Sequence, residues 1–291
     1  MSDLPLSVQL GLGDPRYPVT LRDLADPPEV LYCMGDLSLL ARGIAIIGAR
    51  RATPYGLGAT RRFAAWAARA GVTVISGAAA GCDQAAHGAA LEAGGRTVAV
   101  LGCGADIDYP ASARRMLELV RLQHLVVSEV PWGCPPTRYA FPRRNRIIAA
   151  LSGAVLVVEA GLPSGTFSTA DAALDLGRSV LAVPGSINSP ESRGSNRLIR
   201  QGAAPITDVS DLSSELSAVG ILTDTRSDGD CLRTPTGPLE HMLAADPMRP
   251  DDVARALDVD IVAAIRELGM AEMEGRIVRC RDGRYGLPLG P

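Results

Sequence analysis

The chain has 291 residues, of which 47% are hydrophobic, so it is long enough and apolar enough for one large domain and one small one. This composition excludes a chain that is disordered throughout. No apolar run reaches the roughly 18–20 residues of a membrane helix, and the N-terminus has no basic segment followed by an apolar one. We therefore expect a cytoplasmic protein with no membrane partner.

The charge is distributed unevenly. The formal net charge is -3, and all 29 basic residues are arginine. Between Glu129 and Glu159 there are arginines but no acidic residue, so an acidic total does not exclude a local anion-binding patch. Because the chain contains no lysine, a Walker-type ATPase is excluded.

Cysteine and histidine give little material for a metal site. The 6 cysteines form no C-x-x-C pair, and the 3 histidines lie far apart in the sequence. We expect reduced thiols, no metal and no cofactor.

The first part of the chain is predicted to be a lead-in segment followed by an α/β domain. Residues 1–42 are rich in proline and turn residues and are expected to pack on a sheet. From residue 43, runs that are apolar on both faces alternate with amphipathic helical patterns, which is typical of a Rossmann-like doubly wound parallel sheet over residues 43–209. The expected strands are 43–49, 72–77, 96–102, 124–130, 154–160 and 179–185, and the expected helices are 57–71, 84–95, 112–122, 144–153, 168–177 and 196–202.

The C-terminal part is predicted to be a separate small domain. Residues 210–236 are interpreted as a linker, and residues 237–291 as a winged helix with helices at 239–245, 250–258 and 260–274 and a hairpin at Asp282-Gly283. The third helix carries Arg266 among acidic residues, which duplex DNA would repel, whereas the wing is basic. We interpret this domain as protein-binding or regulatory. The acidic residues of that helix are Asp258, Asp260, Glu267, Glu272 and Glu274, and the arginines of the wing are Arg276, Arg279, Arg281 and Arg284.

Three glycine-bearing turns follow predicted strands and should meet at one edge of the sheet. In an open parallel sheet, ligands bind beyond the carboxyl ends of the strands, where backbone N–H groups and helix N-termini attract anions. The turns carry Gly48, Arg50 and Arg51; Ser76, Gly77 and Gly81; and Ser164, Gly165 and Thr166.

The segment "YAFPRRNRIIAALSG" places Arg143, Arg144 and Arg146 beside an apolar run with no carboxylate between them. We expect the loop 131–142 to fold this segment over the same edge of the sheet, with its charge unpaired. Arginine makes bidentate contacts with phosphate, and an aromatic ring such as Phe141 can stack on an unpaired base. Together they favour single-stranded nucleic acid as the ligand.

Several of these residues also have structural interpretations. Phe141 fits a core position as well as a stacking one, and Asn145 fits a role in holding backbone as well as one in contacting ligand. Asp83 and His87 lie four apart, which suits an acid–base pair or hydrogen bonding on the helix surface. Glu159 and Asp171 could serve hydrolysis, but no second reactive group accompanies them. Tyr109-Pro110 is interpreted as turn geometry.

Four ordered motifs together resemble the DNA-processing protein A family (DprA, also called Smf). They are "IAIIGAR", "SGAAAGCDQAAH", "FPRRNRIIAALS" and "EAGLPSGTFSTADAA", and the similarity continues through "VPG" and "GSNRLIRQGA" to about residue 210. Many members carry a small helical domain ahead of the region that begins here near residue 15, and we expect this chain to lack it.

The resemblance implies an extended Rossmann fold and a non-enzymatic protein. Members bind single-stranded DNA without sequence preference, protect incoming DNA in natural transformation, form homodimers and load the RecA recombinase. Arg143 occupies a variable position of the motif and is not carried over. The residues carried over as the DNA-binding site are Gly48, Arg50, Phe141, Arg144, Asn145, Arg146, Ser164, Gly165 and Thr166.

Two other functions remain as alternatives. A nucleotide-binding phosphoribohydrolase of the same Rossmann variant would carry a P-G-G-x-G-T-x-x-E run, whereas this chain has "GLPSGTFSTAD". A transcription regulator acting through the winged helix would bind duplex DNA tightly, which the acidic third helix disfavours.

Overall fold

A computed structural model describes residues 6–222, 237–245, 247–280 and 283–287. The chain divides into two compact units, Met1–Arg226 and Ser227–Pro291, which are described separately. No helix in these ranges is both long and apolar enough to cross a membrane.

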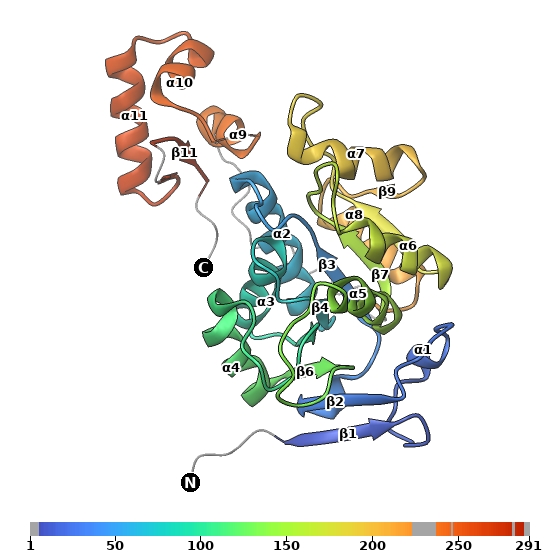
Figure 1. The fold of residues 1–291 in the computed structure, drawn as a ribbon. Helices are drawn as coiled ribbons and strands as arrows, with labels where there is room; N and C mark the ends of the chain where they lie inside the picture. Colours follow the sequence, from blue (N-terminus) through green and yellow to red (C-terminus); the bar gives the residue numbers. More distant parts are fainter. Residues whose placement is uncertain (1–5, 223–236, 246, 281–282, 288–291) are drawn as a thin grey trace. The chain divides into compact units, whose positions relative to one another are not determined.

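Unit 1 is built on a nine-stranded sheet in its described residues, with the order β1-β2-β6-β5-β4-β3-β7-β8-β9 (Figure 1). The strands from β6 to β9 in this order are parallel, and β2 and β1 add antiparallel strands beside β6. The predicted α/β, mostly parallel sheet is therefore confirmed. The strands are β1 Ser7–Gly11, β2 Val30–Gly35, β3 Gly43–Ile47, β4 Val74–Ser76, β5 Thr97–Leu101, β6 Leu125–Ser128, β7 Ser152–Val157, β8 Ser179–Ala182 and β9 Ala204–Pro205.

The strand order reverses between β3 and β7. The chain adds β4, β5 and β6 on one side of β3, and then places β7, β8 and β9 on the other side. In doubly wound sheets the loops diverge at such a reversal, and the crevice that they leave at the carboxyl ends of the strands is the usual ligand site.

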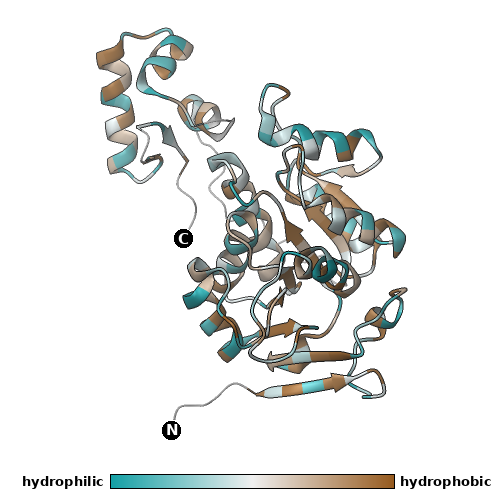
Figure 2. Cartoon of the chain, in the orientation of Figure 1, coloured by the Kyte–Doolittle hydropathy of each residue, from teal (hydrophilic) through white to brown (hydrophobic). Residues whose placement is uncertain are grey.

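Helices cover both faces of this sheet. Alternate residues of β3 supply two separate cores, because successive side chains of a strand point to opposite faces. Ala45 and Ile47 pack with α1, α5, α6 and α7, whereas Ile44 and Ile46 pack with α2, α3 and α8. The central strands of the sheet are accordingly hydrophobic along most of their length (Figure 2). The helices are α1 Val19–Arg22, α2 Pro54–Arg69, α3 Cys82–Glu92, α4 Arg114–Gln123, α5 Ala140–Leu151, α6 Phe167–Asp175, α7 Arg193–Arg200 and α8 Val209–Ala218.

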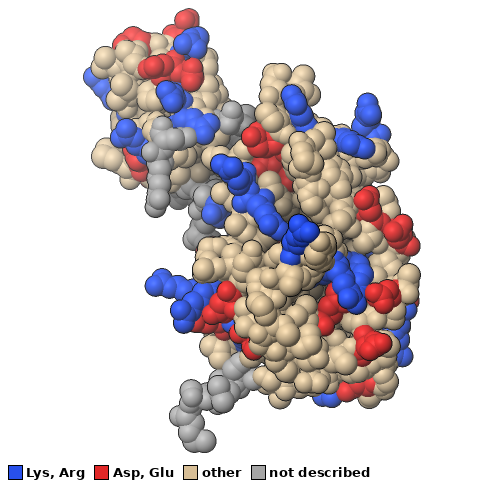
Figure 3. All heavy atoms as spheres, viewed as in Figure 1, with Lys and Arg blue, Asp and Glu red and all other residues tan. Residues whose placement is uncertain are grey.

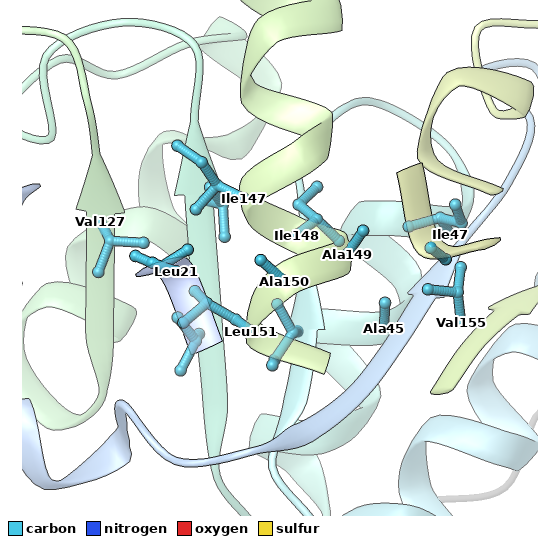
Figure 4. Packing of buried hydrophobic residues seen from close by; sticks show 14 of the residues in the cluster. Leu21, Ala45, Ile47, Val127, Ile147, Ile148, Ala149, Ala150, Leu151 and Val155 are labelled. Carbon is cyan, nitrogen blue, oxygen red and sulfur yellow. The ribbon is translucent and has the colours of Figure 1, made fainter. Parts of the chain in front are cut away.

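Helix α5 is the most deeply embedded element near the predicted site. Its second half, residues 147–151, is wholly buried, and the helix packs against β3, β4, β5 and β7, with Leu21 of α1 on the same side (Figure 4). The apolar run that follows the arginines in the sequence is thus the anchor of the helix that carries them.

Two predicted boundaries need correction. The lead-in segment contributes β1 and β2 to the sheet instead of only packing on it. The segment interpreted as a linker begins with α8, whose Leu212 and Leu216 are fully buried. Its serines and acidic residues suggested a solvated turn, but they lie on the other face of the helix and in its capping box, where Asp208 and Asp211 bond each other's backbone. Residues 223–236 lie outside the described residues.

Unit 2 contains the three helices and the antiparallel strand pair that its sequence predicts. The helices enclose a small core that includes Leu243, Val253 and Leu268. Their arrangement as a winged helix stays a prediction. The elements are α9 Pro238–Ala245, α10 Pro250–Leu257, α11 Ile261–Met273, β10 Val278–Arg279 and β11 Tyr285–Gly286.

The predicted basic wing is partly neutralised within this unit. Arg276 forms ion pairs with Glu240 and with Glu274, the latter at 2.6 Å. Arg279 lies over the ring of Tyr285, with 5.9 Å between the guanidinium carbon and the ring centroid. Arg281 and Asp282 lie outside the described residues.

The burial of α8 predicts that it stabilises unit 1. Leu216→Ala should lower the free energy of unfolding by about 2–5 kcal/mol, because it leaves a cavity in the core on that face of the sheet. Ser214→Ala, on the exposed side of the same helix, is the matched control and should change it by less than about 1 kcal/mol. Urea unfolding of both variants measures the difference, and equal midpoints would show that α8 does not pack as described.

Candidate nucleic-acid interface

The arginine segment lies at the carboxyl edge of the sheet, as predicted. Helix α5 begins at Ala140, so Arg143, Arg144 and Arg146 occupy its first two turns. The Arg144 Nη1 donates to the carbonyl oxygen of Gly77, at 2.6 Å, and to that of Val100. The loop 131–142 does not have to carry the segment across the sheet. Helix α5 follows the parallel strand β6, and a helix that follows a parallel strand starts at the carboxyl end of that strand.

Arg144 points into the protein and not toward solvent. Arg144 is only 4% exposed, and its guanidinium lies between the ends of β4 and β5. Burial lowers the pKa of Arg144, and the charge of Asp83 opposes that effect. Burial raises the pKa of Asp83, and the positive charge of Arg144 opposes this increase. The two groups thus stabilise each other's charged forms.

The turn after β4 is shaped around this buried arginine. Asp83 accepts hydrogen bonds from the N–H groups of Gly77 and Ala79, at 3.1 and 3.3 Å. A Cβ atom on Gly77 would lie 2.2 Å from the Arg144 Nη1, so no side chain fits at that position. Gly48 plays a similar part after β3, where a Cβ atom would lie 2.6 Å from the Cys82 Sγ. Arg144 and Gly48 therefore position the turns of the site.

The expectation of unpaired charge is wrong for the other two arginines. Glu129 accepts a hydrogen bond from Arg146 at 2.5 Å, and Arg143 lies 3.2 Å from the same carboxylate. Asp26 lies near both arginines, at 3.9 Å from Arg146 and 3.7 Å from Arg143. Glu129 directly follows β6, which brings it to the same edge of the sheet although it is distant from the arginines in the sequence.

An exposed cation and two aromatic rings lie together at this edge. The Arg50 guanidinium carbon is 5.4 Å from the centroid of the Phe141 ring, a cation–π distance. The Tyr109 ring packs against Phe141 with 5.6 Å between centroids and 34° between planes. Phe141 is half-buried, and Tyr109 is 39% exposed. The Phe141 ring is thus only partly accessible, with Arg50 over it and Tyr109 packed against it.

Tyr109 is the residue that the sequence analysis missed. It was assigned to turn geometry because a Tyr-Pro pair is a common turn signal. Its place beside Phe141 depends on a contact between a loop and the start of α5, 32 residues apart, for which a single sequence carries no signal.

The third turn is joined to α5 through Asn145. The Asn145 amide donates to the Ser168 Oγ at 2.7 Å and to the Gly165 carbonyl at 3.5 Å, and its oxygen accepts from the Arg144 Nε at 3.2 Å. Of the two interpretations of Asn145, these bonds favour the one in which it holds backbone. Ser164 donates to Thr166, leaving Gly165 exposed at the tip of the turn.

The candidate acid–base groups are engaged in structural contacts. Both oxygens of Glu159 accept hydrogen bonds from Thr53, one from its N–H at 2.8 Å and one from its hydroxyl at 2.6 Å. His87 Nδ1 lies 2.7 Å from the Thr97 Oγ1, so His87 and Asp83 face different partners. Asp171 is exposed on α6. Among the described residues, no group of three or more His, Cys, Asp or Glu could hold a metal ion.

The arrangement suits an anionic, aromatic ligand. Figure 3 shows a band of arginine atoms across the face that lies over the start of α2 and over α5. Arg50 supplies an exposed charge, and the rings of Phe141 and Tyr109 supply surfaces on which a flat base can stack.

Comparisons with a family model and with known proteins indicate the same family. The family described as DNA recombination-mediator protein A matches residues 9–217. Protein Smf of Synechocystis sp. is 41% identical over 214 residues, which make up 72% of this chain and 54% of that protein. The chain thus spans about half the length of this curated relative.

Two solved structures have similar folds. The DNA processing protein A (DprA) of Streptococcus pneumoniae is 37% identical, with a TM-score of 0.69, and the match covers 72% of this chain and 74% of that one. The Helicobacter pylori protein, described for its single-stranded DNA binding mode, is 32% identical with a TM-score of 0.66, covering 73% and 96%.

The burial of Arg144 predicts a cost in stability when it is removed. Arg144→Ala should lower the free energy of unfolding by about 2–5 kcal/mol, because it leaves the buried carbonyl oxygens of Gly77 and Val100 without their donor and removes the positive charge that offsets the burial of Asp83. Arg143→Ala, two-thirds exposed on the same helix, should cost less than about 1 kcal/mol. Denaturant unfolding tests both variants, and a double variant Asp83→Leu/Arg144→Met should recover part of the loss. A wild-type midpoint for Arg144→Ala would contradict the buried pair.

The burial of His87 predicts a loss of stability in acid. Burial lowers the pKa of His87 to about 3, and its Nε2 has no hydrogen-bond partner among the described residues. As the pH falls below the ordinary value of 6.5, only the unfolded chain binds this proton, so the free energy of unfolding falls by up to about 1.4 kcal/mol per pH unit. Unfolding of wild type and His87→Gln between about pH 4 and pH 8 measures this, and the wild-type curve should be the steeper one. Parallel curves would mean that His87 is protonated in the folded protein.

Proposed function

Because this chain belongs to the DNA recombination-mediator protein A family, as its motifs predicted, we propose that it binds single-stranded DNA without sequence preference. The observation that carries the proposal is the exposed Arg50 guanidinium held over the Phe141 ring, with Tyr109 beside it. A cation and aromatic faces at one place can bind the phosphate and the unpaired base of the same strand. The Helicobacter pylori relative, described for single-stranded DNA binding, supports the assignment.

The site residues divide into two groups in this proposal. Arg50 and Phe141 contact the strand directly, and the turn of Ser164, Gly165 and Thr166, with Gly165 exposed at its tip, meets the strand just before the start of α6. Gly48, Arg144 and Asn145 hold the turns in place. Arg146 shares Glu129 with Arg143, so it meets phosphate only where the strand competes with that carboxylate.

We assign binding and no catalysis to this site. The glutamate that a phosphoribohydrolase would use is absent from the "GLPSGTFSTAD" turn, and Glu159 is held on both oxygens by Thr53. Incubation with nucleoside monophosphates should release no free base, and release would establish the enzymatic alternative.

The proposed biological role is recombination mediation. A protein that coats incoming single strands can protect them in natural transformation and load the RecA recombinase onto them, in the cytoplasm, as a homodimer. The family description, a recombination mediator, supports this role. Sedimentation at micromolar protein tests the dimer, and RecA filament assembly on coated single strands tests the loading.

The Arg50 and Phe141 contacts predict a specific binding defect. Arg50→Ala should weaken binding of oligo-dT by about 10-fold or more, because it removes a charge-assisted contact worth about 1.5–3 kcal/mol. Phe141→Leu should weaken it by roughly 5-fold to 100-fold through lost stacking. Fluorescence anisotropy at several salt concentrations measures the affinities, and the wild-type affinity should fall as salt rises.

The matched control is Arg143→Ala, which removes one exposed charge from the same edge and should stay within about twofold of wild type. Thermal melts of the Arg50 and Phe141 variants should stay close to that of wild type. Salt-insensitive binding, or wild-type affinity in the double variant Arg50→Ala/Phe141→Leu, would overturn the proposal.

A further inference from the structure

A second group of arginines lies on α7. Arg193, Arg197 and Arg200 are spaced by four and three residues, which places them within one narrow face of the helix, and all three are exposed. Figure 3 shows arginine atoms over α7 on the same side of unit 1 as the band over α2 and α5.

These arginines have no carboxylate partner in the part of the chain that the structure describes. The nearest acidic residue in sequence, Glu191, accepts a hydrogen bond from the Ser189 hydroxyl at 2.9 Å instead. Arg193 is the first residue of α7, where the helix dipole disfavours a cation. An anion from outside the protein would therefore meet no competing carboxylate at this ridge.

A chain of contacts connects the ridge to the proposed DNA site. Asn145 of α5 bonds the carbonyl of Gly165, and Phe167 begins α6 two residues later. The Arg197 guanidinium carbon lies 5.8 Å from the centroid of the Phe167 ring, which is half-buried. The pairing of Arg197 with Phe167 repeats the pairing of Arg50 with Phe141, with the exposed tip of the third turn between the two.

Helix α7 is fixed to the same edge of the sheet. Its Gly194 N–H donates to the carbonyl of Ala160, three residues after the end of β7, at 2.6 Å. Asn196 bonds both the N–H and the carbonyl of Gly185, at 3.1 and 2.9 Å. The ridge therefore has a set position relative to the third turn and is presented by backbone that is held in place.

We propose that Arg193, Arg197 and Arg200 form a second contact surface for the phosphate backbone of single-stranded DNA, with Phe167 as a second stacking ring. This inference rests on the proposed function of the first site. A strand bound at Phe141 passes over the turn at Gly165 and reaches α7. Only strands longer than the first site can occupy both surfaces.

The test compares a short oligo-dT of about six nucleotides with a long one of about 20, since site sizes of such proteins run to roughly 4–16 nucleotides. The triple variant Arg193→Ala/Arg197→Ala/Arg200→Ala should bind the short strand like wild type and the long strand about 10-fold or more weakly. For the long strand, the slope of log affinity against log salt should fall by about 2, since each lost phosphate contact contributes about 0.7. Phe167→Leu should weaken only the long strand.

The charge-matched control is Arg42→Ala/Arg69→Ala/Arg115→Ala, which removes three exposed arginines from other parts of unit 1. It should bind both strands within about twofold of wild type. If the triple α7 variant keeps wild-type affinity for the long strand, the inference is overturned, while the proposal for the site at Arg50 and Phe141 is unaffected. The ridge would then be available to an acidic protein partner. If wild type binds neither strand, the proposed function itself fails. An equal loss for the α7 variant and its control would also overturn the inference, because net charge alone would explain it.

Discussion

The buried Arg144 is the interaction on which the candidate site depends. A cation removed from water is costly, and it persists only where opposite charge and hydrogen-bond acceptors surround it. Here Asp83 supplies the charge, and the carbonyls of Gly77 and Val100 supply the acceptors. Each partner comes from a different segment, so one side chain joins α5 to the ends of β4 and β5. Phe141 lies three residues earlier on the same helix, and fixing Arg144 therefore fixes the ring that is proposed to stack on DNA.

The other charges at this edge are balanced differently. Glu129 neutralises much of Arg143 and Arg146, so the arginine segment at the start of α5 is not the part of this edge with the most available charge. Arg50 and the ridge on α7 remain exposed instead. Pairing with a carboxylate keeps a cluster of cations stable before ligand arrives, at the cost of competition when phosphate approaches. Of the three arginines at the start of α5, Arg144 is buried, and Arg143 and Arg146 are paired with Glu129. The arginines that the proposals assign to DNA binding are instead Arg50 and those of α7.

Much of the fold could be predicted from the sequence, because buried parallel strands are apolar on both faces. β3, β5 and β6 each lie within the predicted runs, and the helices between them follow from their periodicity. β1 and β2 were missed because their proline-rich surroundings suggested turns. All of α8 was missed, because its serine and aspartate residues suit linkers as well as helices and helix caps. The motifs identify the candidate site residues, but they do not show which of these residues are buried, paired or exposed. Whether Arg144 points inward and Glu129 reaches Arg146 depends on contacts between distant segments.

The same contacts bear on the absence of sequence preference in the proposed function. Side-chain amides and guanidinium groups are among the groups that most often read a base, and they do so only when they are free to bond its edge. The amide of Asn145 is used by Ser168 and Gly165, and the guanidinium of Arg144 is used by backbone carbonyls. What remains accessible is a cation over a ring, at Arg50 and Phe141 and again at Arg197 and Phe167. Every nucleotide has a phosphate and a flat face, so a surface built from these pairs would accept any base.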